Sequence, residues 1–267
     1  MDTTVIIVSY KSDHLIEENI EIFNKETKII IIDNSYNKVL KKNIENKFKN
    51  VKVVLNHNKG FGQAANLGAQ LADTKYIFFC SPDNYVEKDA VNNLEDVSQD
   101  LNDKFGILIL SEKNDTISEN TRVDDSIGIS CFFIQKKKFF LMNGFDENFF
   151  LYYEDRDLVK RFLDKKYTIY KVPIKFSGLF GSHNKIYNYP IEINRNWHLM
   201  WSMFYYKKKH WGYLYSLFTT LPFLIRSLIR VVIYFKKQKE RDIYLARFKG
   251  LYNSYKLNKS WYRPEID

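Results

Sequence analysis

The chain has 267 residues, of which 45% are hydrophobic and 16% aromatic, and its formal net charge is +9. This length allows one large domain, or a domain with an appendage, and in either case a sizeable core. Two cysteines, Cys80 and Cys131, exclude a disulfide framework, and we expect buried thiols because both lie in apolar runs; no Cys-x-x-Cys pair or His/Cys cluster indicates structural zinc.

The first part of the chain alternates apolar runs with helical patterns. The runs cover residues 5–10, 28–33, 51–55 and 76–80, and helices are expected near 13–24, 39–48 and 63–71. Continuous apolar runs of this kind are typical of strands that are buried on both faces of a parallel sheet. The repeated strand–helix order therefore predicts an α/β fold, with a mostly parallel central sheet flanked by helices.

Polar residues follow these strands at the edge where such sheets bind ligands. Asp33 ends the second strand, where it either caps the next turn or accepts hydrogen bonds from a nucleobase or ribose; its position in the sheet favours the second role. Ser81-Pro-Asp-Asn84 is either a plain turn or a site where Asp83 ligates Mg²⁺ or Mn²⁺ bound to a diphosphate.

Residues 58–68 form a glycine-containing loop that enters a helix. Gly60 and Gly62 permit the close approach of a ligand, and the start of a helix is a natural phosphate site. Gly60-Phe-Gly-Gln-Ala-Ala65 also fits a loose dinucleotide pattern, with Asp83 about twenty residues further on. A nicotinamide-dependent oxidoreductase is therefore an alternative, although the pattern follows the third strand and not the first.

The middle of the chain is less regular. Strands are expected near 105–110, 131–134 and 167–172, a polar loop at 111–127 and a helix at 155–163. Residues 145–158 interleave acids with large aromatic side chains, a mixture that suits a pocket holding a proton acceptor against a ring-shaped substrate. Asp155 is the candidate general base, because aromatic neighbours raise the pKa of a carboxylate. Glu154 would orient the base or the acceptor, and Asp157 caps the helix or pairs with Arg161.

After about residue 190 the chain becomes aromatic and basic. Residues 211–235 form an apolar stretch of 25 residues, interrupted by Pro222, Arg226 and Arg230. Because charges at mid-span are costly, we expect helices that lie in a membrane interface with basic ends facing lipid phosphates. A non-catalytic adaptor for membranes or nucleic acid is a further alternative, but the apolar stretch suits lipid better, so no nucleic-acid partner is expected.

Five segments occur together in the order of one known family: 5–10, 30–35, 58–68, 81–83 and 144–161. They resemble family 2 inverting glycosyltransferases with the GT-A fold. Within that family, residues 144–158 resemble the bacterial rhamnosyltransferase branch that builds O-antigen, capsule and cell-wall polysaccharides. The resemblance predicts a GT-A domain at 1–190 and a helical, membrane-associating extension at 191–267.

The resemblance implies a hexosyltransferase that uses a nucleotide-diphosphate sugar, with dTDP-rhamnose as the best guess, and a lipid-linked or growing glycan acceptor. Asp155 would deprotonate the acceptor hydroxyl, with Glu154 beside it, and Asp83 would hold a Mg²⁺ or Mn²⁺ ion, with His183 as a further metal or phosphate contact. The implied nucleotide-sugar site comprises Ser9, Tyr10, Asp33, Asn58, Gly60, Gly62, Asn66 and Asp83. Since Met1 leads directly into a strand without a signal-peptide pattern, the expected location is the cytoplasmic face of the bacterial plasma membrane.

Overall fold

The chain forms two compact units in the computed structural model, which describes residues 2–178 and 188–263. One unit comprises Met1–Asp146 and Asp155–Ser182, and the other comprises Glu147–Glu154 and His183–Asp267. The short segment 147–154 thus belongs with the C-terminal helices, although it is followed in the chain by a helix of the first unit.

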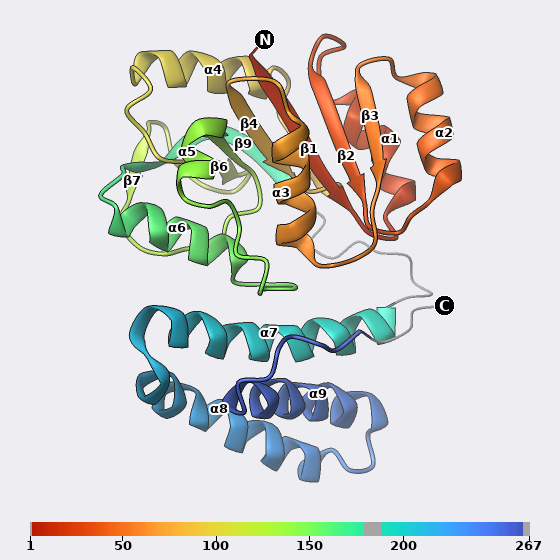
Figure 1. Cartoon of the computed structure of the whole chain (residues 1–267), viewed down its shortest axis with the longest axis vertical. Coiled ribbons are helices and arrows are strands. Elements are labelled where there is room, and N and C mark those ends of the chain that lie inside the picture. The colour runs from red at the N-terminus through yellow and green to blue at the C-terminus, as the bar shows by residue number, and fades with distance from the viewer. Residues whose placement is uncertain (1, 179–187, 264–267) are drawn as a thin grey trace. The chain divides into compact units, whose positions relative to one another are not determined.

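The first unit is built on one sheet (Figure 1). Its strands are β1 (Thr3–Ser9), β2 (Lys28–Asp33), β3 (Val51–Leu55), β4 (Tyr76–Cys80), β5 (Asn84–Val86), β6 (Leu108–Glu112), β7 (Thr121–Val123), β8 (Phe132–Gln135) and β9 (Ile169–Gly178). Its helices are α1 (Asp13–Glu21), α2 (Lys38–Lys47), α3 (Phe61–Leu71), α4 (Ala90–Asp100), α5 (Lys136–Leu141) and α6 (Glu154–Asp164).

The strands lie in the order β3-β2-β1-β4-β8-β6-β9-β5, and β7 pairs with β9. The block β3-β2-β1-β4 is parallel throughout, whereas β8 joins β4 and β6 antiparallel. The predicted α/β fold with a mostly parallel sheet flanked by helices is therefore confirmed, although the sheet is mixed and its block of four parallel strands lies at one side. Since the four parallel strands point the same way, the residues that follow them gather at one edge of the sheet.

Apolar side chains of β1 alternate between two separate cores. Val5 and Ile7 pack into the core that contains residues of α1, α2 and α4, whereas Ile6 packs into the core that contains residues of α3 and α6. This alternation follows from the two-residue period of a strand and explains why the run is apolar at successive positions. Cys80 and Cys131 are also buried in this sheet, which confirms the prediction of two buried thiols.

The sequence prediction was wrong in one polar region and incomplete elsewhere. The expected loop 111–127 contains β7, which pairs antiparallel with β9. The last strand also runs to Gly178, because its second half pairs with β5, a short strand that apolar periodicity did not indicate. Edge pairings of this kind are set by backbone hydrogen bonds and leave little trace in side-chain hydropathy.

The second unit contains three helices, α7 (Asn188–Trp211), α8 (Tyr213–Ile233) and α9 (Gln238–Tyr255). Helix α9 packs on both α7 and α8 (Figure 1). The core between these helices is aromatic and includes Trp197, Trp201 and Phe204. Residues 258–263 fold back onto α7, where the carbonyl of Asn258 accepts a hydrogen bond of 3.0 Å from Trp201 Nε1.

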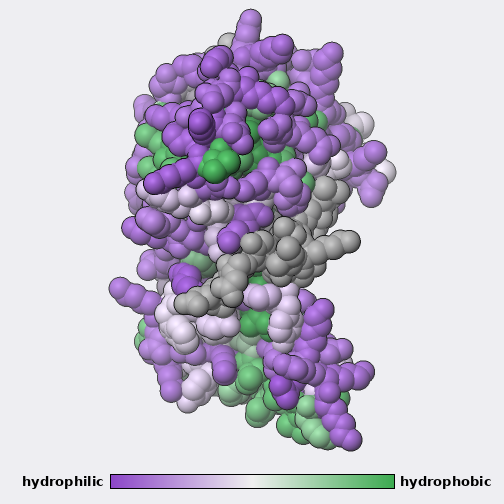
Figure 2. All heavy atoms as spheres, turned by 90° about the vertical axis from the view of Figure 1, so that its right-hand side faces the viewer, coloured by the Kyte–Doolittle hydropathy of each residue, from purple (hydrophilic) through white to green (hydrophobic). Residues whose placement is uncertain are grey.

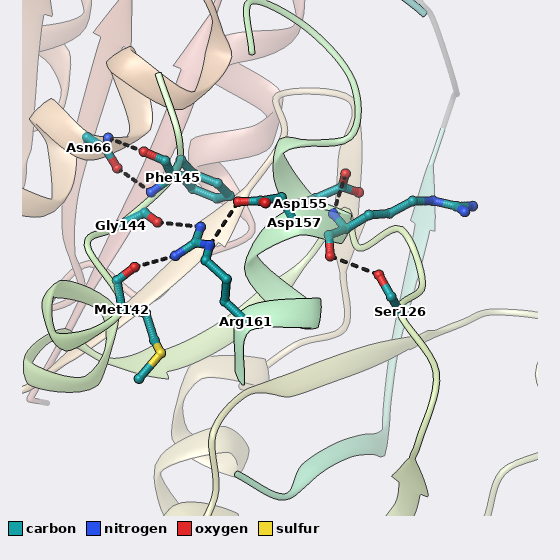
Figure 3. Close-up of polar contacts among 9 residues, drawn as sticks. Asn66, Ser126, Met142, Gly144, Phe145, Asp155, Asp157 and Arg161 are labelled. Atoms are coloured by element: carbon teal, nitrogen blue, oxygen red, sulfur yellow. Dashed lines mark hydrogen bonds and ion pairs between the residues drawn. The ribbon is translucent and has the colours of Figure 1, made fainter. Parts of the chain in front are cut away.

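A hydrogen-bonded chain links α6 to α3 in the first unit (Figure 3). Arg161 Nε donates to Asp157 at 2.8 Å, which confirms the predicted pair, and its two terminal nitrogens donate to the carbonyls of Met142 and Gly144. The next residue, Phe145, exchanges two hydrogen bonds with the side-chain amide of Asn66, at 2.8 and 2.9 Å. One guanidinium and one amide therefore fix the turn at 142–145 between two helices.

Replacing Arg161 with methionine tests this link. Asp157 is fully buried, so its carboxylate would lose its cation and two carbonyls would lose their donor. Removing one partner of a buried ion pair costs about 3–5 kcal/mol, which urea unfolding of Arg161→Met would measure. Arg122→Met is the matched control, because Arg122 and Asp124 form a pair that is 68% and 72% exposed, and exposed pairs contribute about 0–1 kcal/mol. An equal decrease in the free energy of unfolding in both variants would contradict the role of Arg161 in linking α6 to α3.

Candidate active site

The carboxyl edge of the parallel strands carries Ser9 and Asp33, which are paired in register at the ends of β1 and β2. The carboxylate of Asp33 is fully buried and accepts hydrogen bonds from the backbone N–H groups of Ser35 at 3.0 Å and Asn37 at 2.6 Å. It therefore caps the turn after β2, the first of the two roles that the sequence allowed. Base recognition by Asp33 stays a prediction.

Ser9 is also buried, and its hydroxyl has no hydrogen-bond partner among the described residues. Tyr10 follows it and is half-buried. Next in the chain, Lys11 has its backbone N–H bonded to the hydroxyl of Ser35 at 2.6 Å, which joins the turns that follow β1 and β2. These two turns thus form one continuous polar edge.

The loop that enters α3 depends on Asn58 and two glycines. Asn58 Oδ1 accepts a hydrogen bond from the N–H of Gly60 at 3.2 Å, and Gly60 has φ = 109°, a conformation that favours glycine. Gly62 has a different role: a Cβ there would lie 3.0 Å from Cβ of Phe145. Gly62 is buried and packs closely against Phe145, and its predicted contact with the nucleotide sugar stays a prediction.

Asp83 is half-buried and follows β4, but its neighbour Asn84 turns inward. The Asn84 side chain is 3% exposed and donates to the sulfur of Cys131 at 3.2 Å. The described residues contain no group of three or more His, Cys, Asp or Glu side chains that could hold a metal ion, and His183 lies outside the described residues. A single carboxylate suits a Mg²⁺ or Mn²⁺ ion whose other ligands come from a diphosphate and water.

Asp155 is held at the first turn of α6 by two backbone groups. Its Oδ2 accepts a hydrogen bond from the N–H of Ile129 at 2.8 Å, and its Oδ1 accepts one from Arg156, also at 2.8 Å. The carbonyl of Arg156 accepts a hydrogen bond from the Ser126 hydroxyl at 2.8 Å, so the loop before β8 is tied to the start of α6 (Figure 3). Burial raises the pKa of Asp155, although these N–H groups oppose the shift. A fixed carboxylate with a raised pKa has the properties of a general base.

Segment 147–154, which leads into Asp155, is anchored within the helical unit. The carbonyl of Leu151 accepts a hydrogen bond of 2.9 Å from Ser202, and the rings of Phe149 and Tyr153 pack on Tyr205 and Tyr206 of α7. The segment ends at the buried Glu154. Tyr152 and Tyr153 both have left-handed backbones, with φ of 69° and 68°. Such a conformation costs roughly 1–2 kcal/mol per residue, so the anchoring contacts hold a strained path into the candidate base.

The structure gives one predicted residue a packing role and adds an aromatic pair that the sequence did not single out. Asn66 is buried and uses its amide to hold the backbone of Phe145, and its predicted binding of the nucleotide sugar stays a prediction. Tyr36 and His57, which the sequence did not single out, stack with ring centroids 4.7 Å apart beside the ends of β2 and β3. The Asn-Ser-Tyr and Asn-His sequences after two strands were the available signal for this exposed aromatic pair.

Comparison with solved structures shows the fold. S. aureus TarS, residues 1–349, matches at a TM-score of 0.53 and 14% identity, over 98% of this chain and 93% of that chain. A longer TarS structure matches at a TM-score of 0.55 and 13% identity, over 96% of this chain and 55% of that chain. GalNAc-T7 with UDP, GalNAc and Mn²⁺ matches at a TM-score of 0.57 and 16% identity, over 67% of this chain and 44% of that chain.

Sequence comparison shows the family. No curated protein matches the chain. Residues 4–187, more than half of the chain, match the family described as Glycosyl transferase family 2. The chain therefore belongs to glycosyl transferase family 2 and is a nucleotide-sugar glycosyltransferase with the α/β GT-A fold.

Proposed function

We propose that the protein is an inverting hexosyltransferase that moves L-rhamnose from dTDP-rhamnose to a lipid-linked or growing polysaccharide. The observation that carries the inverting mechanism is Asp155, a carboxylate fixed by two backbone N–H groups with a pKa raised by burial. The choice of rhamnose rests on the likeness of residues 144–158 to the rhamnosyltransferase branch. The lipid-linked acceptor is proposed because it needs an enzyme held at a bilayer, and helix α8 has the length and apolar composition for a membrane contact.

The proposed reaction is a single displacement. The acceptor hydroxyl gives its proton to Asp155 as its oxygen attacks the anomeric carbon, and the bond from that carbon to the diphosphate oxygen breaks. The electron pair of this bond leaves with the nucleoside diphosphate, so the configuration at the anomeric carbon is inverted. Asp33 and the loop at Asn58–Gly60 would hold the nucleotide at the sheet edge, where the start of α3 offers free N–H groups to a phosphate.

A divalent cation that enters with the donor would neutralise charge on the leaving diphosphate. Asp83 is the described residue that would hold it, and His183 is proposed as a second contact. An ion held by one carboxylate of the chain would be bound mainly by the substrate.

Helix α8 is the proposed membrane contact, on the cytoplasmic face of the plasma membrane. Among the described residues it is the one helix with the length and apolar composition to cross a membrane. Its buried residues are Ser216, Thr220 and Ser227. Leu217 and Leu224 pack against the core that contains Phe204, whereas most of its other large apolar side chains are exposed (Figure 2). These are Leu214, Phe218, Leu221, Phe223, Ile225, Leu228, Ile229, Val232 and Ile233. A helix with hydroxyls inside and hydrocarbon outside suits a lipid environment, and the cations at 236–241 suit anionic headgroups.

Asp155→Asn tests the general base. Transfer should fall by about 10²–10⁴-fold, the usual contribution of general-base catalysis, while calorimetry should show unchanged nucleotide binding. Asp164→Asn, on the exposed end of the same helix, is the matched control and should keep its activity. Since only the deprotonated form accepts a proton, wild-type kcat/KM should fall with decreasing pH at a value above the usual aspartate pKa of about 3.9. Near-normal turnover by Asp155→Asn would rule out this base.

A donor screen tests the substrate assignment. We expect faster release of nucleotide from dTDP-rhamnose than from UDP- or GDP-hexoses in the presence of a lipid-linked acceptor. Each donor is measured with Mn²⁺ and with a chelator, because a metal held mainly by the diphosphate should affect the rate. A UDP-hexose turned over faster than dTDP-rhamnose would replace the donor assignment and leave the reaction class unchanged.

Vesicle sedimentation tests the membrane contact. The full chain should bind phosphatidylglycerol vesicles more tightly than phosphatidylcholine vesicles. Phe218→Glu with Val232→Glu, at positions 70% and 67% exposed, should weaken binding by at least about tenfold, because a buried apolar side chain contributes roughly 1.5–3 kcal/mol. The control pair is Val39→Glu with Leu141→Glu, at positions 68% and 63% exposed in the other unit. Equal losses in both pairs would contradict the role of α8.

A further inference from the structure

The helical unit contains a cavity that the proposed reaction does not use. Its volume is about 260 Å³, close to the lower end of ligand pockets at about 300 Å³. Helix α7, the end of α9, the C-terminal segment 258–263 and the start of segment 147–154 contribute its lining. The lining residues are Glu147, Asn148, Phe150, Trp201, Phe204, Tyr205, Lys208, Ser254, Leu257, Asn258, Lys259, Ser260 and Arg263.

The walls of this cavity are held by specific contacts. Trp201 stacks on Tyr205 with ring centroids 5.1 Å apart, and its indole N–H is bonded to the carbonyl of Asn258. His198 bonds the carbonyl of Tyr262 at 2.8 Å and the hydroxyl of Ser260 at 2.9 Å. The C-terminal segment is therefore fastened to α7, and the aromatic wall has a fixed orientation.

The charge of the lining is positive. Lys208, Lys259 and Arg263 face one carboxylate, that of Glu147. No ion pair joins any of these three cations to an acid among the described residues. Arg263 lies over the ring of Phe150, 3.4 Å from its centroid, and burial lowers its pKa to about 10, so it stays charged at neutral pH. Among the described residues, the lining therefore carries three cations and one carboxylate beside aromatic surface.

We infer that this cavity binds a phosphate-bearing carbohydrate, the sugar phosphate or polyol phosphate portion of the acceptor. The cations match a phosphate, and the faces of aromatic rings pack against the apolar C–H faces of a sugar or polyol. The lining is also polar, since it includes the amide side chains of Asn148 and Asn258. The assignment to an acceptor rests on the proposed function, and it is favoured because segment 147–154 lines the cavity and ends next to Asp155 in the chain.

Calorimetry on the full chain, with the donor site saturated by nucleotide, tests the inference. The probes are glucose 1-phosphate, glucose and inorganic phosphate. Glucose 1-phosphate should bind most tightly. Lys208→Gln with Lys259→Gln should weaken it by about tenfold or more, because hydrogen bonds to charged groups contribute about 1.5–3 kcal/mol. Lys249→Gln with Lys256→Gln changes two exposed lysines of the same unit outside the cavity and should leave binding unchanged.

The outcomes separate this inference from the proposed function. Nucleotide affinity should be the same in both lysine variants. Binding of glucose 1-phosphate would support the proposed ligand of the cavity even if rhamnose transfer were not found. Equal affinity for glucose 1-phosphate and glucose, or for glucose 1-phosphate and inorganic phosphate, would overturn the inference. Displacement of the sugar phosphate by phosphatidylglycerol vesicles, with loss of vesicle binding in Lys208→Gln/Lys259→Gln, would identify a lipid-headgroup site instead and also overturn it.

Discussion

The guanidinium of Arg161 is the constraint on which the geometry of the first unit depends. It joins the buried Asp157 to the carbonyls of Met142 and Gly144. The next residue, Phe145, forms two hydrogen bonds with the side-chain amide of Asn66 in α3. Helix α6 carries the candidate base and α3 begins at the candidate phosphate loop. Two chemically distinct parts of the site are therefore held by one buried polar network rather than by apolar packing alone. Such a network specifies a single arrangement because each buried group would be costly without its partner.

The backbone that leads to Asp155, on the proposed acceptor side, is organised differently from the sheet edge. Segment 147–154 packs among aromatic rings of the helical unit and passes through two left-handed tyrosines before it reaches Asp155. Backbone strain of this kind persists only where surrounding contacts impose it, and it is common at functional sites. The proposed nucleotide-sugar edge follows regular strands, whereas segment 147–154, which leads to the candidate base, has an irregular backbone. This division agrees with a common nucleotide-binding scaffold to which variable acceptor recognition is attached.

The sequence predicted the parts of the structure that depend on burial and failed where one polar contact decided the outcome. The apolar runs from Val5 to Cys80 correctly gave four parallel strands, because hydrophobic periodicity reports burial directly. The hydrogen bonds between Asn66 and the backbone of Phe145 were not predicted, because an amide that holds a distant backbone has the same local sequence as one that faces a ligand. The stack of Tyr36 on His57 joins residues from two loops, and the local sequence of each loop shows a ring-bearing side chain but not its partner.

Helix α8 satisfies its inward hydroxyls within its own backbone. Ser216, Thr220 and Ser227 each donate to a carbonyl four residues earlier, and Thr220 also meets the hydroxyl of Tyr255. The polar side of this helix therefore needs no water, and most large apolar side chains on its other side are exposed in the described part of the chain. During purification away from bilayers, molecules of this protein would hide that surface by associating with one another. Reversible clustering that a mild detergent disperses is thus an expected solution property of the isolated polypeptide.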